Sequence, residues 1–296
     1  MKIMKFQGVI PALITPVDEN GKLNKTALKE LLEAQIKEGA DGFYVGGATG
    51  EGVILDADVL RDLMKESVSI VNHRVPVIIH IARMNNHEMI EMAKYAEKVG
   101  ADAVSAIPPI FYKYDEDSIY AYYKRLADSV GLPIVIYNNP NTGVTFTDDL
   151  LYRLFGTIPS ITAIKWTNYD FTAVLRLKDR FPDACVINGP DEMLLMGLAA
   201  GCDACIGTTY NFQLTRIKNI YNAFRAGNIE EARREQTVAC KIINVMLKNN
   251  VLKCTRLILA RRGFATGIPM FPMLPYASKA EEDKILAELK AAGLEI

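Results

Sequence analysis

Lys165 and Tyr137 are the residues of this sequence whose types and positions most directly suggest chemistry. Lys165 ends the apolar run ITAIK (161–165), and Tyr137 ends the preceding apolar run PIVIY (133–137). A lysine at the end of a buried strand loses hydration, which favours the neutral amine, and such an amine can attack a ketone to form a Schiff base. A neighbouring phenol can shuttle protons. The alternatives are a lysine that reaches solvent from the strand end and an aromatic ring that caps the core.

Two further stretches carry candidate binding groups. The segment GGATGE (46–51) is glycine-rich, so its backbone N–H groups can hold a carboxylate or phosphate, and Thr49 adds a hydroxyl. It lacks the lysine of a P-loop, which argues against a nucleotide, and glycines also simply form turns. In GPDEM (189–193), Asp191 and Glu192 follow the apolar run ACVI. Acidic residues favour the first turn of a helix, so a plain helix start is the alternative to a binding role.

Short apolar runs separated by amphipathic segments indicate the elements that position these groups. The helical segments 25–39 and 89–100 each end in glycine, a common helix terminus. Eight buried strands alternating with helices predict a (β/α)₈ TIM barrel over residues 1–225, followed by a C-terminal helical extension over 226–296. A doubly wound sheet is disfavoured by the number of units and by the lack of G-x-G-x-x-G after the first run. The eight runs are 9–13, 42–45, 77–82, 103–107, 133–137, 161–165, 184–188 and 204–207.

The barrel interpretation places the candidate residues together. Functional groups of such barrels lie at the carboxyl ends of the strands, and adjacent strands are about 4.8 Å apart. We therefore expect Tyr137 and Lys165 to be neighbours at one level, with GGATGE, His80 and GPDEM around the same opening.

Composition and charge exclude several classes of function. The 34 basic and 35 acidic residues form no block of one sign, so we expect neither a nucleic-acid nor a membrane partner. No run approaches the roughly 18 apolar residues of a membrane span, and the N-terminal apolar run is interrupted by Gln7 and Pro11, so we expect a cytoplasmic protein. Five cysteines argue against a disulfide framework. CDAC (202–205) has no second pair, so small apolar residues near a strand are favoured over a metal or redox site.

Five motifs occur in the order and spacing of one family: YVGGATGE, YNNP, AIKWT, GPDEM and GTTYN. Over essentially its whole length, the sequence resembles the class I pyruvate-dependent aldolases that include N-acetylneuraminate lyase and dihydrodipicolinate synthase. The resemblance implies a homotetramer in which Lys165 forms an imine with pyruvate or another 2-oxo acid and Tyr137 transfers protons. It implies no metal or organic cofactor, because the covalent lysine–pyruvate imine is the electron sink. The loop residues Gly47, Ala48 and Thr49 would hold the carboxylate of the oxo acid.

Within this family the sequence is most similar to the N-acetylneuraminate lyase branch. Synthases typically carry an arginine after the YN-x-P turn, whereas the first arginine here is Arg153. Lyases use a G-x-D-E segment to bind the polyol tail of the substrate, and Gly189, Asp191 and Glu192 match it. Thr167 also matches, and Thr208 stands where that branch usually has serine. The resemblance implies reversible cleavage of N-acetylneuraminate, or a related 2-oxo sugar acid, to pyruvate and an aldose such as N-acetylmannosamine.

Two departures from the lyase pattern keep alternatives open. Ala48 replaces the usual serine of the carboxylate loop, and Phe111 aligns with a tyrosine that reaches the neighbouring subunit's site, although Tyr112 is adjacent. With phenylalanine at 111, a proton relay through Thr49 is interrupted. The alternatives are a 2-keto-3-deoxy sugar acid aldolase or dehydratase, a dihydrodipicolinate synthase, and a non-catalytic sugar-acid sensor.

Overall fold

Eight short strands, each on one of the predicted apolar runs, form the centre of the molecule. The structure is a computed structural model that describes residues 5–296. Residues 1–4, with which the predicted barrel segment 1–225 begins, lie outside the described part of the chain. The strands are β1 (Gly8–Pro11), β2 (Phe43–Val45), β3 (Val77–His80), β4 (Ala103–Ala106), β5 (Ile134–Asn138), β6 (Ile161–Trp166), β7 (Cys185–Asn188) and β8 (Ala204–Gly207).

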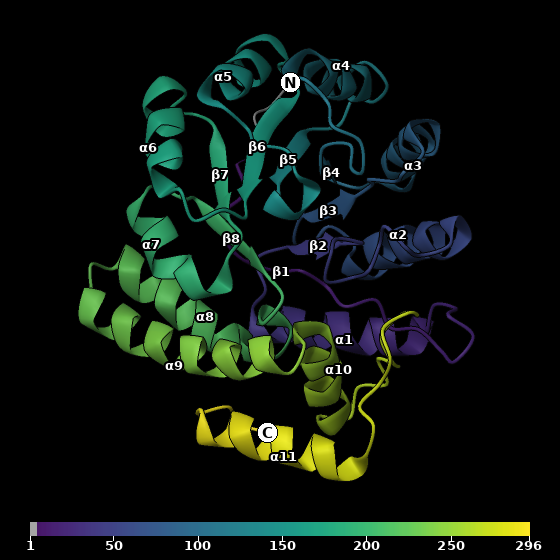
Figure 1. Cartoon of the computed structure of the whole chain (residues 1–296), viewed down its shortest axis with the longest axis vertical. Helices are drawn as coiled ribbons and strands as arrows, with labels where there is room; N and C mark the ends of the chain where they lie inside the picture. Colours follow the sequence, from purple (N-terminus) through teal and green to yellow (C-terminus); the bar gives the residue numbers. More distant parts are fainter. Residues whose placement is uncertain (1–4) are drawn as a thin grey trace.

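Helices occupy the intervals between the strands and surround them (Figure 1). The first and third helices end at Gly39 and Gly100, as predicted, and both glycines adopt left-handed φ angles of 95° and 87°. The third helix begins at Asn86, earlier than predicted, because the Asn85 side chain caps its first turn. The helices are α1 (Lys25–Glu38), α2 (Ala57–Val71), α3 (Asn86–Val99), α4 (Glu116–Ala127), α5 (Asp148–Thr157), α6 (Phe171–Arg180), α7 (Leu194–Ala199), α8 (Tyr210–Arg225), α9 (Ile229–Lys248), α10 (Val251–Arg261) and α11 (Lys279–Ala291), with 3₁₀ turns η1 (Pro140–Thr142) and η2 (Asp191–Met193).

The strands form a parallel barrel. Their order is β1-β8-β7-β6-β5-β4-β3-β2, and neighbouring strands pair in parallel. The two ends of this order meet because Ala12, just after β1, forms a parallel bridge with Tyr44 of β2. The N–H of Leu13 also donates to the Tyr44 carbonyl at 2.9 Å. The predicted (β/α)₈ TIM barrel is therefore confirmed.

One type of helix-to-strand turn fastens the amino end of the barrel three times. It occurs at GADGF (39–43), GADAV (100–104) and GCDAC (201–205). In each turn the aspartate accepts a hydrogen bond from an N–H near the start of the adjacent strand. The pairs are Asp41 with Val9 (2.8 Å), Asp102 with Val77 (2.8 Å) and Asp203 with Val186 (2.9 Å). The end of the barrel opposite the candidate residues is thus rigidly held.

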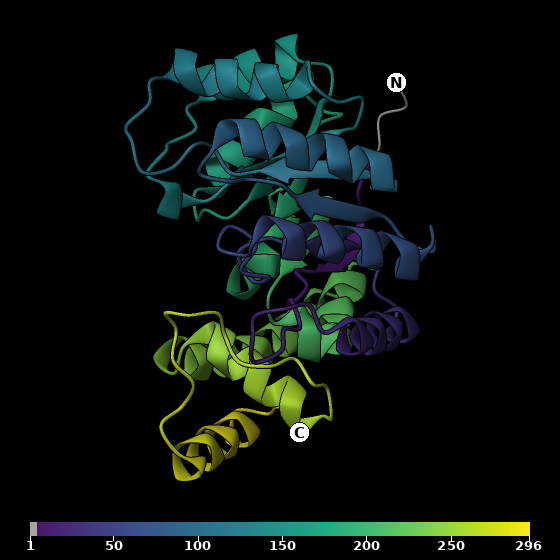
Figure 2. The same ribbon diagram turned by 90° about the vertical axis from the view of Figure 1, so that its right-hand side faces the viewer.

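The last three helices extend the structure on one side of the barrel. α9 packs along α8, α10 contacts both of these helices, and α11 lies at the outer edge of the molecule (Figures 1 and 2). The proposed division between a barrel (1–225) and a helical extension (226–296) remains a prediction.

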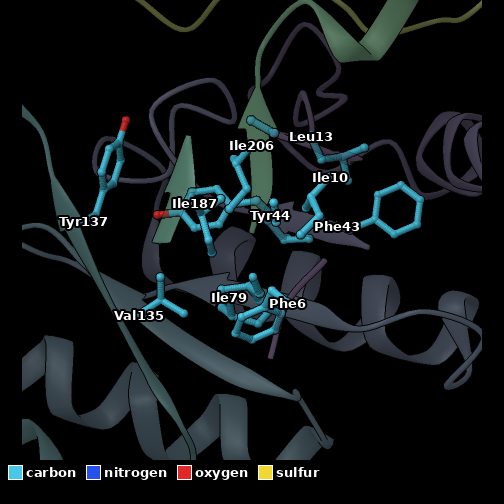
Figure 3. Packing of buried hydrophobic residues seen from close by; sticks show 14 of the residues in the cluster. Phe6, Ile10, Leu13, Phe43, Tyr44, Ile79, Val135, Tyr137, Ile187 and Ile206 are labelled. Carbon is cyan, nitrogen blue, oxygen red and sulfur yellow. The ribbon is translucent and has the colours of Figure 1, made fainter. Parts of the chain in front are cut away.

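Apolar side chains fill the barrel interior. Figure 3 shows Ile79, Val135, Ile187 and Ile206 packed near Tyr44, with Tyr137 to one side. The four aliphatic residues are fully buried. Because such interiors are close-packed, side chains at the strand ends keep nearly fixed mutual distances.

Candidate active site

Lys165 and Tyr137 lie side by side at the carboxyl ends of β6 and β5. They are direct register partners in the parallel pair, as the sequence predicted. The Nζ atom of Lys165 lies 4.0 Å from the centroid of the Tyr137 ring. Only 6% of the lysine is exposed, so its amine is held inside the barrel over an aromatic ring. One bound molecule can therefore contact both side chains.

Tyr44 and His80 complete an aromatic wall around the lysine. The rings of Tyr44, His80 and Tyr137 meet pairwise at centroid distances of 6.0, 5.9 and 6.0 Å, and the Tyr44 centroid is 5.0 Å from the Nζ of Lys165. Burial raises the pKa of Tyr44 well above its usual value, and its hydroxyl is hydrogen-bonded to Ser105 at 3.0 Å. Burial lowers the pKa of His80 to about 4. Both side chains are thus uncharged at neutral pH.

The glycine-rich loop after β2 offers free backbone donors near this wall. The loop is a compact turn in which the N–H of Glu51 donates to the Ala48 carbonyl at 3.1 Å. Within residues 5–296, no backbone carbonyl accepts from the N–H of Ala48 or Thr49, which leaves both available to an anion. The hydroxyls of Thr49 and Thr208 are 2.6 Å apart. The fold thus brings together two candidates that lie far apart in the sequence.

Close approach explains two of the candidate glycines. A Cβ atom on Gly47 would lie 2.4 Å from Cε1 of Tyr44, and a Cβ atom on Gly189 would lie 2.0 Å from Oγ1 of Thr167. Real Cβ atoms do not approach other atoms so closely, so any side chain at either position would displace its neighbour. Gly189 and Thr167, both predicted to bind the substrate tail, are therefore in direct contact.

The glycine-rich loop is also fixed by the C-terminal part of the chain. Glu51, which has a left-handed φ of 55°, forms an ion pair with Arg256 of α10, and each side chain is 3% exposed. Arg256 also donates to the carbonyls of Thr15 and Thr266, and the N–H of Met270 donates to Glu51 at 2.7 Å. The sequence did not predict this pair, because 205 residues separate its members.

The carboxylates of Asp191 and Glu192 are engaged differently. Asp191 is buried and accepts from the N–H and the hydroxyl of Thr209 at 2.8 and 2.7 Å. Glu192 is partly exposed and accepts from the hydroxyl of Tyr169 at 2.6 Å. The two acids begin a 3₁₀ turn, and α7 itself starts only at Leu194. Glu192 is therefore the more accessible of the two to a ligand.

The Asp191→Asn variant should change the pH dependence of stability. Burial raises the pKa of this carboxyl from 3.8 to about 6. A carboxyl whose pKa is higher in the folded state stabilises the fold when protonated, and this contribution is lost as pH rises from about 4 to about 6. Asparagine does not ionise. We therefore expect the free energy of unfolding of the variant, relative to wild type, to increase by about 2 kcal/mol between pH 4 and pH 7.

Urea denaturation at these two pH values measures the effect. The same comparison on Asp18→Asn, an exposed loop residue, is the control. A difference between Asp191→Asn and wild type that is the same at both pH values would show that burial of the charge is not the cause.

The candidates for a contact with another subunit, Phe111 and Tyr112, lie on the loop after β4. Phe111 has a positive φ of 81° and is 79% exposed, and Tyr112 is 67% exposed. Their rings pack edge to face at a centroid distance of 4.9 Å. Adjoining exposed aromatic rings are typical of surfaces that bind a partner, but the contact itself stays a prediction.

Other residues discussed from the sequence lie outside this arrangement. Arg153 is on α5, where it pairs with Asp117. Cys202 and Cys205 are buried and free. Within residues 5–296, no cluster of three His, Cys, Asp or Glu side chains is arranged to bind a metal ion. No helix in this range has the length and apolar character needed to cross a bilayer.

Besides Arg256, three residues around the site were not predicted: Tyr44, Thr209 and Tyr169. Tyr44 lies inside YVGGATGE and Thr209 inside GTTYN, so the motifs themselves contained the available signal. Tyr169 lies between AIKWT and the next helix, and no feature of the sequence distinguishes it from an ordinary loop residue.

Comparison with known proteins identifies the family. The model of the Dihydrodipicolinate synthetase family matches residues 5–292. The chain belongs to this family. The family predicted from the motifs is thus confirmed, and the protein is an enzyme of the class I aldolase type.

Members of both branches of the dihydrodipicolinate synthetase family resemble the chain over its full length. The N-acetylneuraminate lyase of Rhizobium meliloti (strain 1021) is 34% identical over 289 residues, which cover 98% of this chain and 95% of that protein. CdNal from Clostridium difficile, in complex with mannosamine, has a TM-score of 0.93 at 29% identity and covers 98% of this chain and 100% of its own. The dihydrodipicolinate synthase of Bacillus anthracis has a TM-score of 0.92 at 26% identity, and the match covers 97% of this chain and 99% of that chain. The fold is therefore common to both branches, and the residues around the lysine must distinguish them.

Proposed function

We propose that this protein reversibly cleaves N-acetylneuraminate, or a closely related 2-oxo sugar acid, to pyruvate and an aldose such as N-acetylmannosamine. The observation that carries the proposal is the pairing of Lys165 with Tyr137 at the carboxyl ends of β6 and β5. The identity of 34% with a protein named N-acetylneuraminate lyase supports this substrate. The G-x-D-E segment (189–192) and the turn 137–143, which has no arginine, favour it over the synthase reaction.

In the first step Lys165 attacks the C2 ketone of the substrate. The amine forms a C–N bond and the ketone oxygen leaves as water, so that an iminium ion results. The N–H groups of Ala48 and Thr49, with Gly47 beside them, bind the adjacent carboxylate and orient C2 toward the amine. The iminium ion is the electron sink of the reaction, so we propose that no metal or organic cofactor takes part.

Tyr137 then removes the proton of the C4 hydroxyl as the C3–C4 bond breaks. The electron pair of that bond forms an enamine at C3, and C4 becomes the aldehyde of the departing sugar. C3 next takes up a proton, and water hydrolyses the imine to release pyruvate and free Lys165. Because Phe111 has no hydroxyl, the substrate carboxylate or a water carries the proton to and from Tyr137.

The polyol tail would bind at the ends of β6, β7 and β8. Within residues 5–296, the buried hydroxyl of Thr167 has no hydrogen-bond partner, and a ligand hydroxyl would satisfy it. Glu192 offers acceptor oxygens for neighbouring hydroxyls, and Asp191 offers the oxygen that Thr209 leaves free. We propose that Gly189 and Thr208 complete this part of the site.

We also propose that the enzyme is a homotetramer, as the family resemblance implies. The exposed rings of Phe111 and Tyr112 support a contact between subunits at the loop after β4.

Pyruvate release from N-acetylneuraminate, coupled to lactate dehydrogenase, tests the proposed function. We expect turnover with this substrate. Turnover only with 2-keto-3-deoxy sugar acids, or only in condensation of pyruvate with aspartate semialdehyde, would favour the alternative enzymes. If no substrate is turned over and borohydride fails to trap pyruvate on Lys165, the protein is a sugar-acid sensor and the proposed function is wrong.

Tyr137→Phe should separate proton transfer from imine formation. Loss of a positioned acid–base group typically lowers kcat by roughly 10²- to 10⁴-fold, and we expect a loss in this range. Borohydride should still trap pyruvate on Lys165, because the amine is intact. Tyr152→Phe, on α5, is the control. A kcat near that of wild type would exclude Tyr137 as the proton-transfer residue.

A further inference from the structure

Tyr169 is an exposed aromatic residue beside the predicted sugar-binding groups. It lies between β6 and α6, close in sequence to Lys165 and Thr167. Tyr169 is exposed over 66% of its surface, whereas its backbone is held in a turn. The Tyr169 carbonyl accepts from the N–H of Phe171 at 3.0 Å, and the next residue, Asp170, caps α6. Such an anchored loop can present a side chain in a defined direction.

The hydroxyl of Tyr169 is the contact that orients Glu192. It donates to Oε1 of Glu192 at 2.6 Å, and within residues 5–296 no other group donates to this carboxylate. The backbone around Glu192 is fixed separately, because Gln236 donates to the carbonyl of Asp191 at 3.2 Å. The glutamate side chain therefore depends on Tyr169 for its orientation, whereas Asp191 is held by Thr209.

The hydrogen bond persists over the working pH range of an enzyme. The bond to Glu192 raises the pKa of Tyr169 to about 12, so the phenol stays protonated and continues to donate. One carboxylate oxygen is thereby occupied, and the other is left as an acceptor of fixed direction. The ring itself adds an amphipathic surface next to that acceptor.

We propose that Tyr169 is a positioning residue that sets the specificity of the site for substrates with a long hydroxylated tail. It fixes Glu192 so that the remaining oxygen accepts from a tail hydroxyl, and its ring covers the apolar C–H side of the tail. A 2-oxo acid without a tail does not reach this pair and gains nothing from it. The inference rests on the proposed function, since it concerns the sugar end of the same substrate.

The test compares Tyr169→Phe with wild type on two ligands. Phenylalanine keeps the ring and removes the hydroxyl. For N-acetylneuraminate we expect KM to rise about tenfold, the scale for loss of a hydrogen bond to a charged group, with kcat nearly unchanged. For pyruvate, which has no tail, the concentration that half-saturates borohydride trapping on Lys165 should not change. Tyr120→Phe, which loses a hydroxyl contact to Thr157 on α5, is the matched control.

A double-mutant cycle separates positioning from a general structural effect. If Tyr169 acts through Glu192, Tyr169→Phe combined with Glu192→Gln should raise KM no further than Glu192→Gln alone. Additive effects in this cycle, an unchanged KM in Tyr169→Phe, or equal weakening of pyruvate and N-acetylneuraminate would each overturn the inference. If wild type traps pyruvate but cleaves no sugar acid, the proposed function is wrong and the inference is wrong with it. If wild type cleaves the sugar acid and Tyr169→Phe does so equally well, only the inference is wrong.

Discussion

Lys165→Ala is expected to abolish turnover, with a fall in kcat of roughly 10⁴-fold or more, the scale seen when a covalent nucleophile is removed. Alanine has no amine, so neither the imine nor the enamine can form. Lys165 is the lysine whose amine is held against the Tyr137 and Tyr44 rings, and no other lysine of the described chain has this environment. Pyruvate release and borohydride trapping, followed by mass analysis of the peptide that contains residue 165, measure the effect.

Two further variants show whether the loss of turnover comes from the missing imine at residue 165. Lys165→Arg supplies a positive charge at this position but cannot form the imine, so we expect the same loss as with alanine. Lys94→Ala removes an exposed lysine on α3 that pairs with Glu91, and it should leave kcat unchanged. Full activity in Lys165→Arg would mean that charge, and not covalent chemistry, is what the position supplies.

Arg256→Met should destabilise the protein more than any surface substitution. Methionine fills a similar volume but leaves the carboxylate of Glu51 buried and unpaired, which typically costs about 3–5 kcal/mol. Both side chains of this pair are 3% exposed, so water cannot replace the lost partner. Urea denaturation at pH 7, followed through the single and buried Trp166 at one protein concentration, measures the change.

Two further variants show whether a buried unpaired charge causes the loss of stability in Arg256→Met. Arg176→Met breaks an ion pair with Asp148 whose side chains are 48% and 34% exposed, and it should cost no more than about 1 kcal/mol. Adding Glu51→Gln to Arg256→Met should restore part of the stability, because no buried charge then remains. Equal losses in Arg256→Met and Arg176→Met would refute the assignment of a buried charge.

The barrel and its central pair were predictable because their causes are local. Each strand is a short apolar run, and Tyr137 and Lys165 each end one of two consecutive runs, so parallel pairing places them at the same end of the barrel. Their exact register depends on an irregularity at Ile134 and Val135 that the sequence does not reveal. The helix ends at Gly39 and Gly100 were likewise predictable, since a left-handed terminus selects glycine.

The contacts that orient the site were not predictable, because they join segments far apart in the chain. Nothing near Glu51 indicates that Arg256 will neutralise it. Nor does the GPDEM motif reveal that Thr209 occupies one oxygen of Asp191 while Tyr169 holds Glu192. Such pairings follow from the packed geometry of loops, in which a shift of one residue changes every partner.

The ion pair between Glu51 and Arg256 has a consequence for how the protein is made. During synthesis the first barrel strands leave the ribosome long before α10. Arg256, the counter-charge of Glu51 in the glycine-rich loop, is made 205 residues later. Until then Glu51 lacks its counter-charge, and only the hydrogen bonds within the loop hold the turn. A nascent chain that stops short of α10 can form most of the barrel while Glu51 stays uncompensated, so we expect the loop after β2 to reach its final stability only when nearly the whole polypeptide has been made.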